Sequence, residues 1–263
     1  HIVFPGYQGV FDEVDSRTSI AILKQYSSIQ AIIAASKDEL MKIIAVGKQT
    51  MAWREKVYSK LIKAAKNALE IGIPSSIGFA KISIIISLLE SIREQIDRVV
   101  LKIEDLLDSD NISEEFKKNF EIIKTIPGSG FISALTVLAE MSNFNHFSKP
   151  KKLVAFFGID PSVKESGKYK SDNNKISKRG SSFARRALYF IALASIRRKN
   201  NGQLMNPVLK EFYYNKLEKG KKKKVAIAAV MHKLVNYIFA ILRNQKAYEP
   251  REPEIHKNLY LAK

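Results

Sequence analysis

An uninterrupted heptad pattern between residues 82 and 106 constrains the fold of this 263-residue chain more than any other feature. A spacing that averages 3.5 residues keeps one apolar stripe facing a partner helix while two helices supercoil. The pattern predicts one long helix over about residues 78–108, and it favours a coiled-coil arm over an ordinary helix packed on its own domain. The stripe consists of Ile82, Ile85, Leu89, Ile92, Ile96, Val99, Ile103 and Leu106.

Helical spacing dominates the rest of the chain as well, so we predict a mainly α protein. Asn111 or Ser113 is the expected N-cap of one further helix, and two more are expected over about 181–198 and 221–245. The stretch "KKLVAFFGI" fits either a helix that ends at Gly158 or a short strand. The predicted order is a helical linker and coiled-coil region over 1–120, a helical C-terminal domain over 121–248 and a flexible tail over 249–263.

The charge balance indicates the kind of partner. Forty-four Lys and Arg oppose 26 Asp and Glu, a net charge of +18 that favours a polyanion and therefore nucleic acid. The sequence has neither eighteen consecutive apolar residues nor a signal peptide, so we expect a cytoplasmic protein without a membrane partner. The lack of cysteine excludes disulfides, a thiolate nucleophile and cysteine-based zinc sites.

The segment "TIPGSGF" predicts a tight turn between two helices, with Gly128 and Gly130 as candidate phosphate contacts. Backbone amides at the start of the second helix would point at an anion that approaches the turn. The pattern is similar to the helix-hairpin-helix element, which holds a DNA backbone without reading its sequence. A plain helix-to-helix turn that needs glycine for its conformation is the alternative.

Positive charge is concentrated between residues 143 and 199, where fourteen Lys and Arg face three acidic residues. Such a surface would neutralise phosphates and release counterions. Tyr169, Phe183 and Tyr189 lie among the charges and could stack on bases, although core packing is the favoured role for Phe183 and Tyr189. The predicted nucleic-acid contacts here are Lys164, Lys168, Lys170, Lys178, Arg179, Arg185 and Arg186.

Small hydroxyl side chains accompany these cations in "ESGKY" and "SKRGSSFARR". A serine that attacks a phosphodiester needs cations that hold the phosphate and stabilise the charge of the transition state. Ser166, followed by the uncrowded Gly167, is the best candidate for a catalytic nucleophile, while a backbone cap or a phosphate contact is the ordinary role of such a serine. The alternatives are Ser171, Ser177, Ser182 and Ser181, which also has the position of a helix N-cap.

Other catalytic classes find no support in the sequence. The four histidines are widely separated, and neither a P-loop nor a dinucleotide-binding fingerprint occurs. The spaced acidic quartet of a two-metal nuclease is also missing. We therefore predict no metal and no cofactor within this chain.

Four blocks, in this order, resemble the C-terminal transposase domain of the insertion-sequence family named after IS110, IS116 and IS902. They are "TIPGSGFISALTVLAEM", "FSKPKKLVAFFGIDPSVKESGKYK", "ISKRGSSFARRALYFIALAS" and "KKKVAIAAVMHKLVNYIFAIL", within residues 121–248. The resemblance implies a recombinase that joins an N-terminal RuvC-like domain, with an Asp-Glu-Asp-Asp metal site, to a serine-bearing domain. Ser166 matches the serine of the family's Ser-Gly motif, which would form a phosphoserine intermediate with DNA.

The same resemblance implies the partners. They are DNA, a guide RNA called bridge RNA, and further copies of the chain in a dimer or tetramer formed through the coiled coil. The acidic domain and its Mg²⁺ are not in this sequence, so the chain is expected to bind nucleic acid without transposing by itself. Two other hypotheses stay open: a non-catalytic helix-hairpin-helix DNA-binding module, and an oligomeric scaffold built on the heptad helix.

Overall fold

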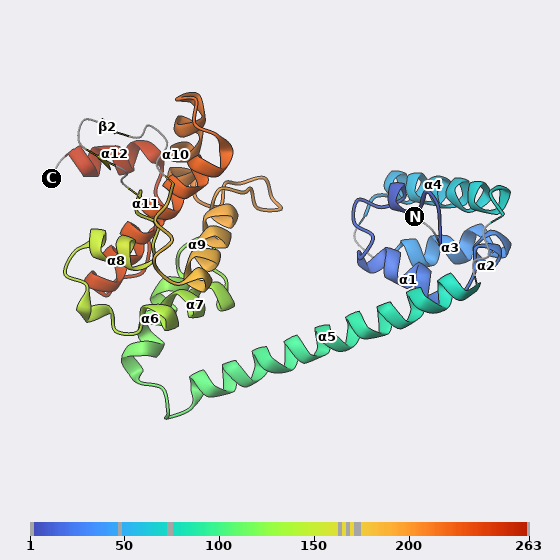
Figure 1. Ribbon diagram of the computed structural model, residues 1–263, viewed down its shortest axis with the longest axis horizontal. Coiled ribbons are helices and arrows are strands. Elements are labelled where there is room, and N and C mark those ends of the chain that lie inside the picture. Colours follow the sequence, from blue (N-terminus) through green and yellow to red (C-terminus); the bar gives the residue numbers. More distant parts are fainter. Residues whose placement is uncertain are drawn as a thin grey trace. The chain divides into compact units, whose positions relative to one another are not determined.

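The structure is a computed structural model that describes residues 3–46, 49–72, 76–162, 165–166, 169–170 and 175–261. Side chains are described over the same ranges except at positions 76, 165–166, 169–170 and 260–261. The described chain is mainly α, which confirms the predicted fold class (Figure 1). It divides into two compact units, His1–Asp105 (unit 1) and Leu106–Lys263 (unit 2). The division falls before the predicted boundary at residue 120.

Unit 1 is a group of helices around one apolar core. Ser16, Ser28, Ser36 and Thr50 cap the first four α-helices, and each side-chain oxygen accepts a hydrogen bond from the backbone N–H three residues later. The core is built on fully buried aliphatic side chains such as Ile22, Ile32, Leu40, Ile44 and Leu61. The elements are η1 (Tyr7–Gly9), α1 (Arg17–Gln25), α2 (Ile29–Ala34), α3 (Lys37–Ile44), α4 (Met51–Glu70) and most of α5 (Ser76–Asp108).

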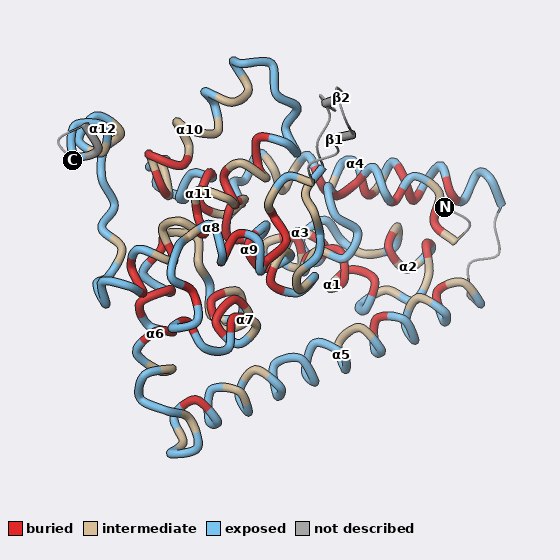
Figure 2. Tube along the Cα trace, turned by 60° about the vertical axis from the view of Figure 1, so that its left-hand side comes forward, coloured by how far each residue is buried: buried red, intermediate tan, exposed pale blue. Residues whose placement is uncertain are grey.

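The long helix predicted from the heptads is confirmed as α5. In its first part Ile86 is buried, and Ile82 and Leu89 pack against the core of unit 1. Beyond that part most of the stripe faces solvent, with Ile92 60 % and Val99 55 % exposed, while Ile103 is half-buried (Figure 2). The coiled-coil pairing of this stripe stays a prediction.

In the part of the chain that the structure describes, unit 2 holds the remaining helices and one short strand pair. Ser113 caps α6, and "KKLVAFFGI" forms a helix, α8, rather than a strand. The chain leaves α8 through Gly158, whose φ of +66° lies in the left-handed region that glycine adopts without strain. The elements are α6 (Glu114–Lys124), α7 (Phe131–Met141), η2 (Phe144–His146), α8 (Pro150–Phe156), β1 (Glu165–Ser166), β2 (Tyr169–Lys170), α9 (Ser182–Ser195), α10 (Pro207–Glu218), α11 (Lys223–Asn244) and α12 (Pro253–Leu261).

Helix α11 is the core helix of unit 2. It packs against α6, α8, α9 and α10, with Val230, Leu234, Val235 and Ile238 fully buried. Among the described residues it is the one helix long and apolar enough to cross a membrane. Because 56 % of its most apolar stretch is buried inside the protein, core packing accounts for this apolar character.

The C-terminal segment differs from the flexible tail expected over 249–263. Residues Pro253–Leu261 form α12, which packs on α10. Lys257 Nζ lies 2.6 Å from Glu211 Oε1, and His256 Nε2 lies 3.4 Å from the Tyr237 hydroxyl. Proline is favoured in the first turn of a helix, and these contacts with α10 and α11 supply the stabilisation that the polar composition does not reveal.

Candidate nucleic-acid interface

Cations surround the N-terminus of α9. Ser181 is the N-cap, as predicted, and its Oγ accepts hydrogen bonds from the backbone N–H groups of Phe183 and Ala184 at 3.2 Å. Lys178 and Arg179 are exposed just before the helix, and Arg186 is exposed in its second turn. The N-terminus of a helix already carries partial positive charge, so the cations of Lys178, Arg179 and Arg186 repel it and one another. A bound anion would relieve this repulsion.

An antiparallel pair of segments, 158–162 with 175–178, leads away from this helix start. Backbone hydrogen bonds join Lys178 N to Gly158 O at 2.9 Å, Ser177 N to Asp160 O at 2.8 Å and Ser162 N to Lys175 O at 2.7 Å. Beyond them β1 pairs with β2, with Ser166 opposite Tyr169. We call these paired segments and strands the arm. The backbone of Ser166 therefore lies in the outermost described pair of the arm.

Two glycines fix the base of the arm. A Cβ at Gly158 would lie 2.6 Å from Gly180 N, and a Cβ at Gly180 would collide with the carbonyl oxygen of Phe156. Arg185 Nη1 donates to Gly180 O at 2.5 Å and to Phe157 O at 3.3 Å. Arg185, predicted as a nucleic-acid contact, thus holds two backbone segments together where the arm begins.

The structure also bears on the other candidate serines. Ser177 Oγ donates to Asp160 Oδ1 at 2.5 Å, and the oxygen of Ser181 is occupied in capping α9. Ser182 is exposed at the first position of α9. The side chains of Ser166 and Lys170 lie outside the described residues, and so do Lys164, Lys168 and Ser171 altogether.

The predicted glycine turn joins α6 to α7. Gly128 has a φ of +98°, and a Cβ there would lie 2.6 Å from Ser195 N. Ser195 Oγ donates to Pro127 O at 2.6 Å, so the turn is held against the last residue of α9. Gly130 is the exposed N-cap of α7, without a side-chain cap and with open space where a Cβ would be. Phosphate contact at this turn stays a prediction.

The predicted site residues therefore form two groups at opposite ends of one helix. The arm starts beside Ser181 and the glycine turn contacts Ser195, and α9 has 14 residues. At 1.5 Å per residue the two groups are about 20 Å apart. The arm and the turn are supported by the same helix without forming one compact site.

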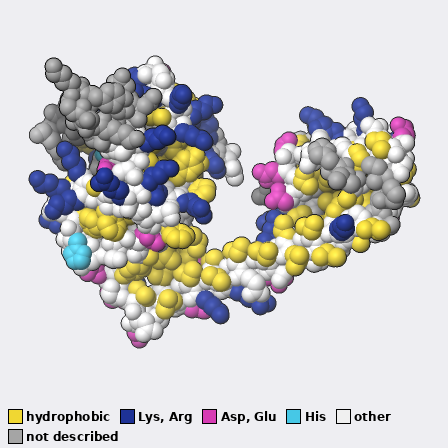
Figure 3. Space-filling model, in the orientation of Figure 1, with side chains coloured by type: hydrophobic (Ala, Val, Ile, Leu, Met, Phe, Trp, Pro, Cys, Tyr) yellow, Lys and Arg dark blue, Asp and Glu magenta, His cyan; other side chains and the backbone are white. Residues whose placement is uncertain are grey.

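Core packing was the wrong prediction for two aromatic residues of α9. Phe183 is 65 % and Tyr189 36 % exposed, and Phe190 is 55 % exposed. The helix packs on α7 and α11 mainly through alanines, with Leu188 and Ile191, so its aromatic rings face outward. On the face shown in Figure 3, hydrophobic side chains lie among Lys and Arg over this part of unit 2.

Some exposed cations were not among the predicted nucleic-acid contacts. Arg197, Arg198 and Lys199, which belong to the basic region predicted over 143–199, follow α9 in a tight hairpin, where Arg198 Nη1 donates to Gly202 O at 2.8 Å. A run of lysines is exposed before and at the start of α11. The run is visible in the sequence and could have predicted a further nucleic-acid contact. It comprises Lys219, Lys221, Lys222, Lys223 and Lys224.

A second group of ionisable side chains lines a pocket of about 640 Å³ between α10, α11 and α12. Burial lowers the pKa of His232 and of Lys233, and for Lys233 the nearby Glu211 carboxylate opposes the shift. Burial raises the pKa of the Tyr237 hydroxyl. Lys233 Nζ lies 4.6 Å from the centre of the Phe212 ring. These contacts hold α10, α11 and α12 together.

The fold and the charges define a basic helical unit with a serine-bearing arm. Residues 120–214 match the profile of the transposase IS116/IS110/IS902 family. The match covers less than half of the chain, and it agrees with the resemblance of the sequence blocks in that region.

Individual proteins with similar sequences agree with the family match of residues 120–214. An uncharacterised 42 kDa protein of insertion element IS900 from Mycobacterium paratuberculosis is 25 % identical over 94 % of this chain and 58 % of its own length. The pilin gene-inverting protein of Moraxella bovis is 27 % identical over 54 % of this chain and 42 % of its own length. The transposase of IS1111A from Coxiella burnetii is 30 % identical over 48 % of this chain and 33 % of its own length. The chain thus spans about half the length of the curated relatives it matches, or less.

Replacing Gly180 with alanine should loosen the base of the arm. The added methyl group collides with the Phe156 carbonyl, and overpacking of this kind costs about 1–3 kcal/mol. Hydrogen exchange should accelerate at the amides of Ser177 and Lys178, which bridge the arm. Gly130→Ala is the matched control, because it meets open space and should cost less than about 1 kcal/mol. Unchanged exchange in Gly180→Ala would contradict the close crossing.

Proposed function

We propose that this chain is the serine-bearing, nucleic-acid-binding portion of a transposase, a DNA recombinase that moves an insertion sequence. One observation carries the proposal: the outer strand pair that contains Ser166 belongs to an arm seated on the cationic N-terminus of α9. The family match supports it, and so does the description of one relative as a transposase. DNA is the proposed substrate, a guide RNA the second partner and the cytoplasm the location.

The proposed chemistry is a transesterification at Ser166. Its Oγ attacks a DNA phosphorus atom, an O–P bond forms, and the bond from phosphorus to the leaving deoxyribose oxygen breaks. The serine proton is transferred to a base or to water, and the departing oxygen takes up a proton. The reverse attack by another strand's hydroxyl releases the serine and completes the exchange. Cations beside the arm, such as Lys178 and Arg179, would stabilise the charge on the phosphoryl oxygens.

The proposed recombinase also needs Mg²⁺, but we do not propose that the described residues bind it. Among the described parts of the chain, no three His, Asp or Glu side chains group as metal ligands. The donor set of a magnesium site is therefore not found there, and no step above passes through the ion. We assign Mg²⁺ to an acidic RuvC-like domain outside this sequence.

Ser166→Ala should abolish a covalent protein–DNA adduct. The assay supplies the chain together with the acidic domain, guide RNA and element DNA, and adducts are trapped by denaturation. Loss of one hydroxyl leaves the cations in place, so DNA affinity should change by less than about twofold, in keeping with a backbone-dominated interaction. Ser171→Ala is the matched control and should still form the adduct. An adduct that survives Ser166→Ala would refute the assignment.

The alternative is a non-catalytic helix-hairpin-helix module, favoured by the open N-terminus of α7 at Gly130. Gly130→Asp tests its phosphate contact, because aspartate is a good N-cap and should preserve the fold while its charge repels phosphate. DNA affinity should fall about tenfold, whereas the neutral cap in Gly130→Ser should retain it. Equal affinity in both variants, measured by fluorescence anisotropy, would remove the turn from the interface. If the chain is only a DNA-binding module, no covalent protein–DNA adduct should form even when Ser166 is intact.

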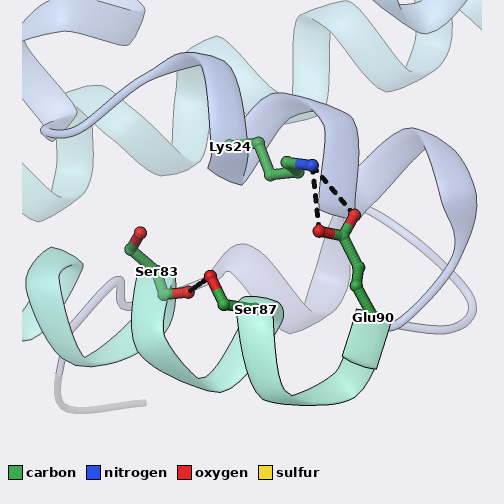
Figure 4. Close-up of polar contacts among 4 residues, drawn as sticks. All are labelled: Lys24, Ser83, Ser87 and Glu90. Atoms are coloured by element: carbon green, nitrogen blue, oxygen red, sulfur yellow. Dashed lines mark hydrogen bonds and ion pairs between the residues drawn. The ribbon is translucent and has the colours of Figure 1, made fainter. Parts of the chain in front are cut away.

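The exposed stripe of α5 supports self-association. Lys24 Nζ on α1 holds both carboxylate oxygens of Glu90 on α5, at 2.9 and 3.0 Å, and Ser87 Oγ donates to Ser83 O within α5 (Figure 4). These contacts belong to the part of α5 that packs in unit 1. In the stripe beyond, Ile92, Ile96, Val99 and Leu106 are exposed, and they suit the same stripe of a second copy, in a dimer or tetramer.

Ile92→Asp should disrupt this self-association. A carboxylate at a seam position would lose its water on pairing, so dimer affinity should fall more than about tenfold. Leu101→Asp is the matched control: Leu101 is 59 % exposed on the same helix but lies outside the stripe. Sedimentation should give a lower mass for Ile92→Asp alone. A mass unchanged by both substitutions would contradict the coiled coil.

A further inference from the structure

The outward face of α9 alternates aromatic rings with arginines. Phe183, Arg186 and Phe190 follow one another at intervals of three and four residues, and the same spacing continues to the half-buried Leu193. Such spacing places side chains in one row along a helix. Arg197 follows in the hairpin just past Ser195, the last residue of α9. Arg186 and Arg197 are exposed, and the two phenylalanines are the most exposed rings of the helix. We call Phe183, Arg186, Phe190 and Arg197 the α9 row.

The exposure of Phe183 and Phe190 is not needed for the packing of α9 in unit 2. The buried side of α9 already packs on α7 and α11, with Ala184, Leu188 and Ile191 in contact with the interior. The Phe190 ring meets Tyr189 edge-on, with ring centres 6.1 Å apart. Large apolar rings at these exposures, flanked by cations, indicate a surface that binds a ligand.

The dimensions and charges of the row fit a polyanion with flat rings. Phe183 and Phe190 are seven residues apart, about 10 Å along the helix axis, which equals the rise of about three stacked bases. Arg186 lies between them, and Arg179 lies before the helix. Asp160 is the one acidic side chain described between residues 143 and 199, and it is already bonded to Ser177. The row therefore combines stacking platforms with exposed positive charge.

We propose that the α9 row binds unpaired nucleotides of a nucleic-acid strand, with bases stacked on Phe183 and Phe190 and phosphates at Arg186 and Arg197. This inference rests on the proposed function and specifies that the bound nucleic acid is single-stranded. The row begins at the arm that carries Ser166 and ends at the glycine turn, so a single strand on it would join the two groups of the interface. Paired duplex bases hide their faces in the stack and would gain little from the rings.

A double substitution tests the rings. Phe183→Ala with Phe190→Ala should weaken binding of a poly-thymidine oligonucleotide at least about tenfold, because each stacked base contributes substantially to single-strand affinity. Affinity for a duplex of equal length should change less than about twofold, and the dependence of affinity on salt should stay the same, since no phosphate contact is removed. Both rings are exposed, so the fold should be preserved, and thermal unfolding checks this.

Two controls separate stacking from other causes. Leucine at both positions keeps apolar area without a flat ring and should bind the single strand as weakly as alanine does. Leu101→Ala removes an apolar side chain on α5 that is 59 % exposed and should have no effect.

Three binding results would overturn the inference. They are full single-strand affinity in the alanine double variant, recovery of affinity with leucine, and an equal loss for single strand and duplex. A lower sedimentation mass in the alanine variant would assign the row to a protein interface and would also overturn it. If the unaltered chain binds neither single strand nor duplex, the proposed function itself fails, which is a separate outcome.

Discussion

The contact between the chain after α8 and the chain before α9 leaves no space for a side chain, and the position of the arm depends on it. Gly158 turns the chain in the left-handed region, and Gly180 passes against the carbonyl of Phe156. Arg185 then binds carbonyl oxygens from both segments. Because the two segments of the arm pair from this point outward, a shift at the crossing would move every pair beyond it, including the strand that contains Ser166.

Helix α9 makes this local contact part of a larger surface. Its first turn is capped by Ser181 next to the arm, and Ser195 at its last position binds the turn that contains Gly128. Its small buried residues allow close packing on α7 and α11, which fixes the helix and leaves its rings and arginines outside. In the proposed recombinase a strand held along α9 would present a phosphate to the arm at one end.

Much of the fold could be predicted from the sequence, because helix periodicity and capping are local signals. The heptads of α5 and the caps Ser113 and Ser181 are examples. The tail was different: α12 depends on contacts with α10 and α11, which no local pattern reveals. Phe183 and Tyr189 were misassigned for a related reason, since aromatic residues on an amphipathic helix suggest burial until alanines are known to fill the interface. The roles of Ser166, Lys164, Lys168 and Lys170 were inferred from composition and resemblance, and their side chains lie outside the described residues.

The central claim is that α9 presents one nucleic-acid surface between the arm and the glycine turn. Photo-crosslinking with a single-stranded oligonucleotide that contains 5-iodouracil, followed by mass spectrometry of the peptides, tests it most directly, because this base couples to aromatic rings stacked on it. The account predicts crosslinks at Phe183 and Phe190. Crosslinks confined to other exposed aromatic residues, such as Tyr214 on α10, would contradict it.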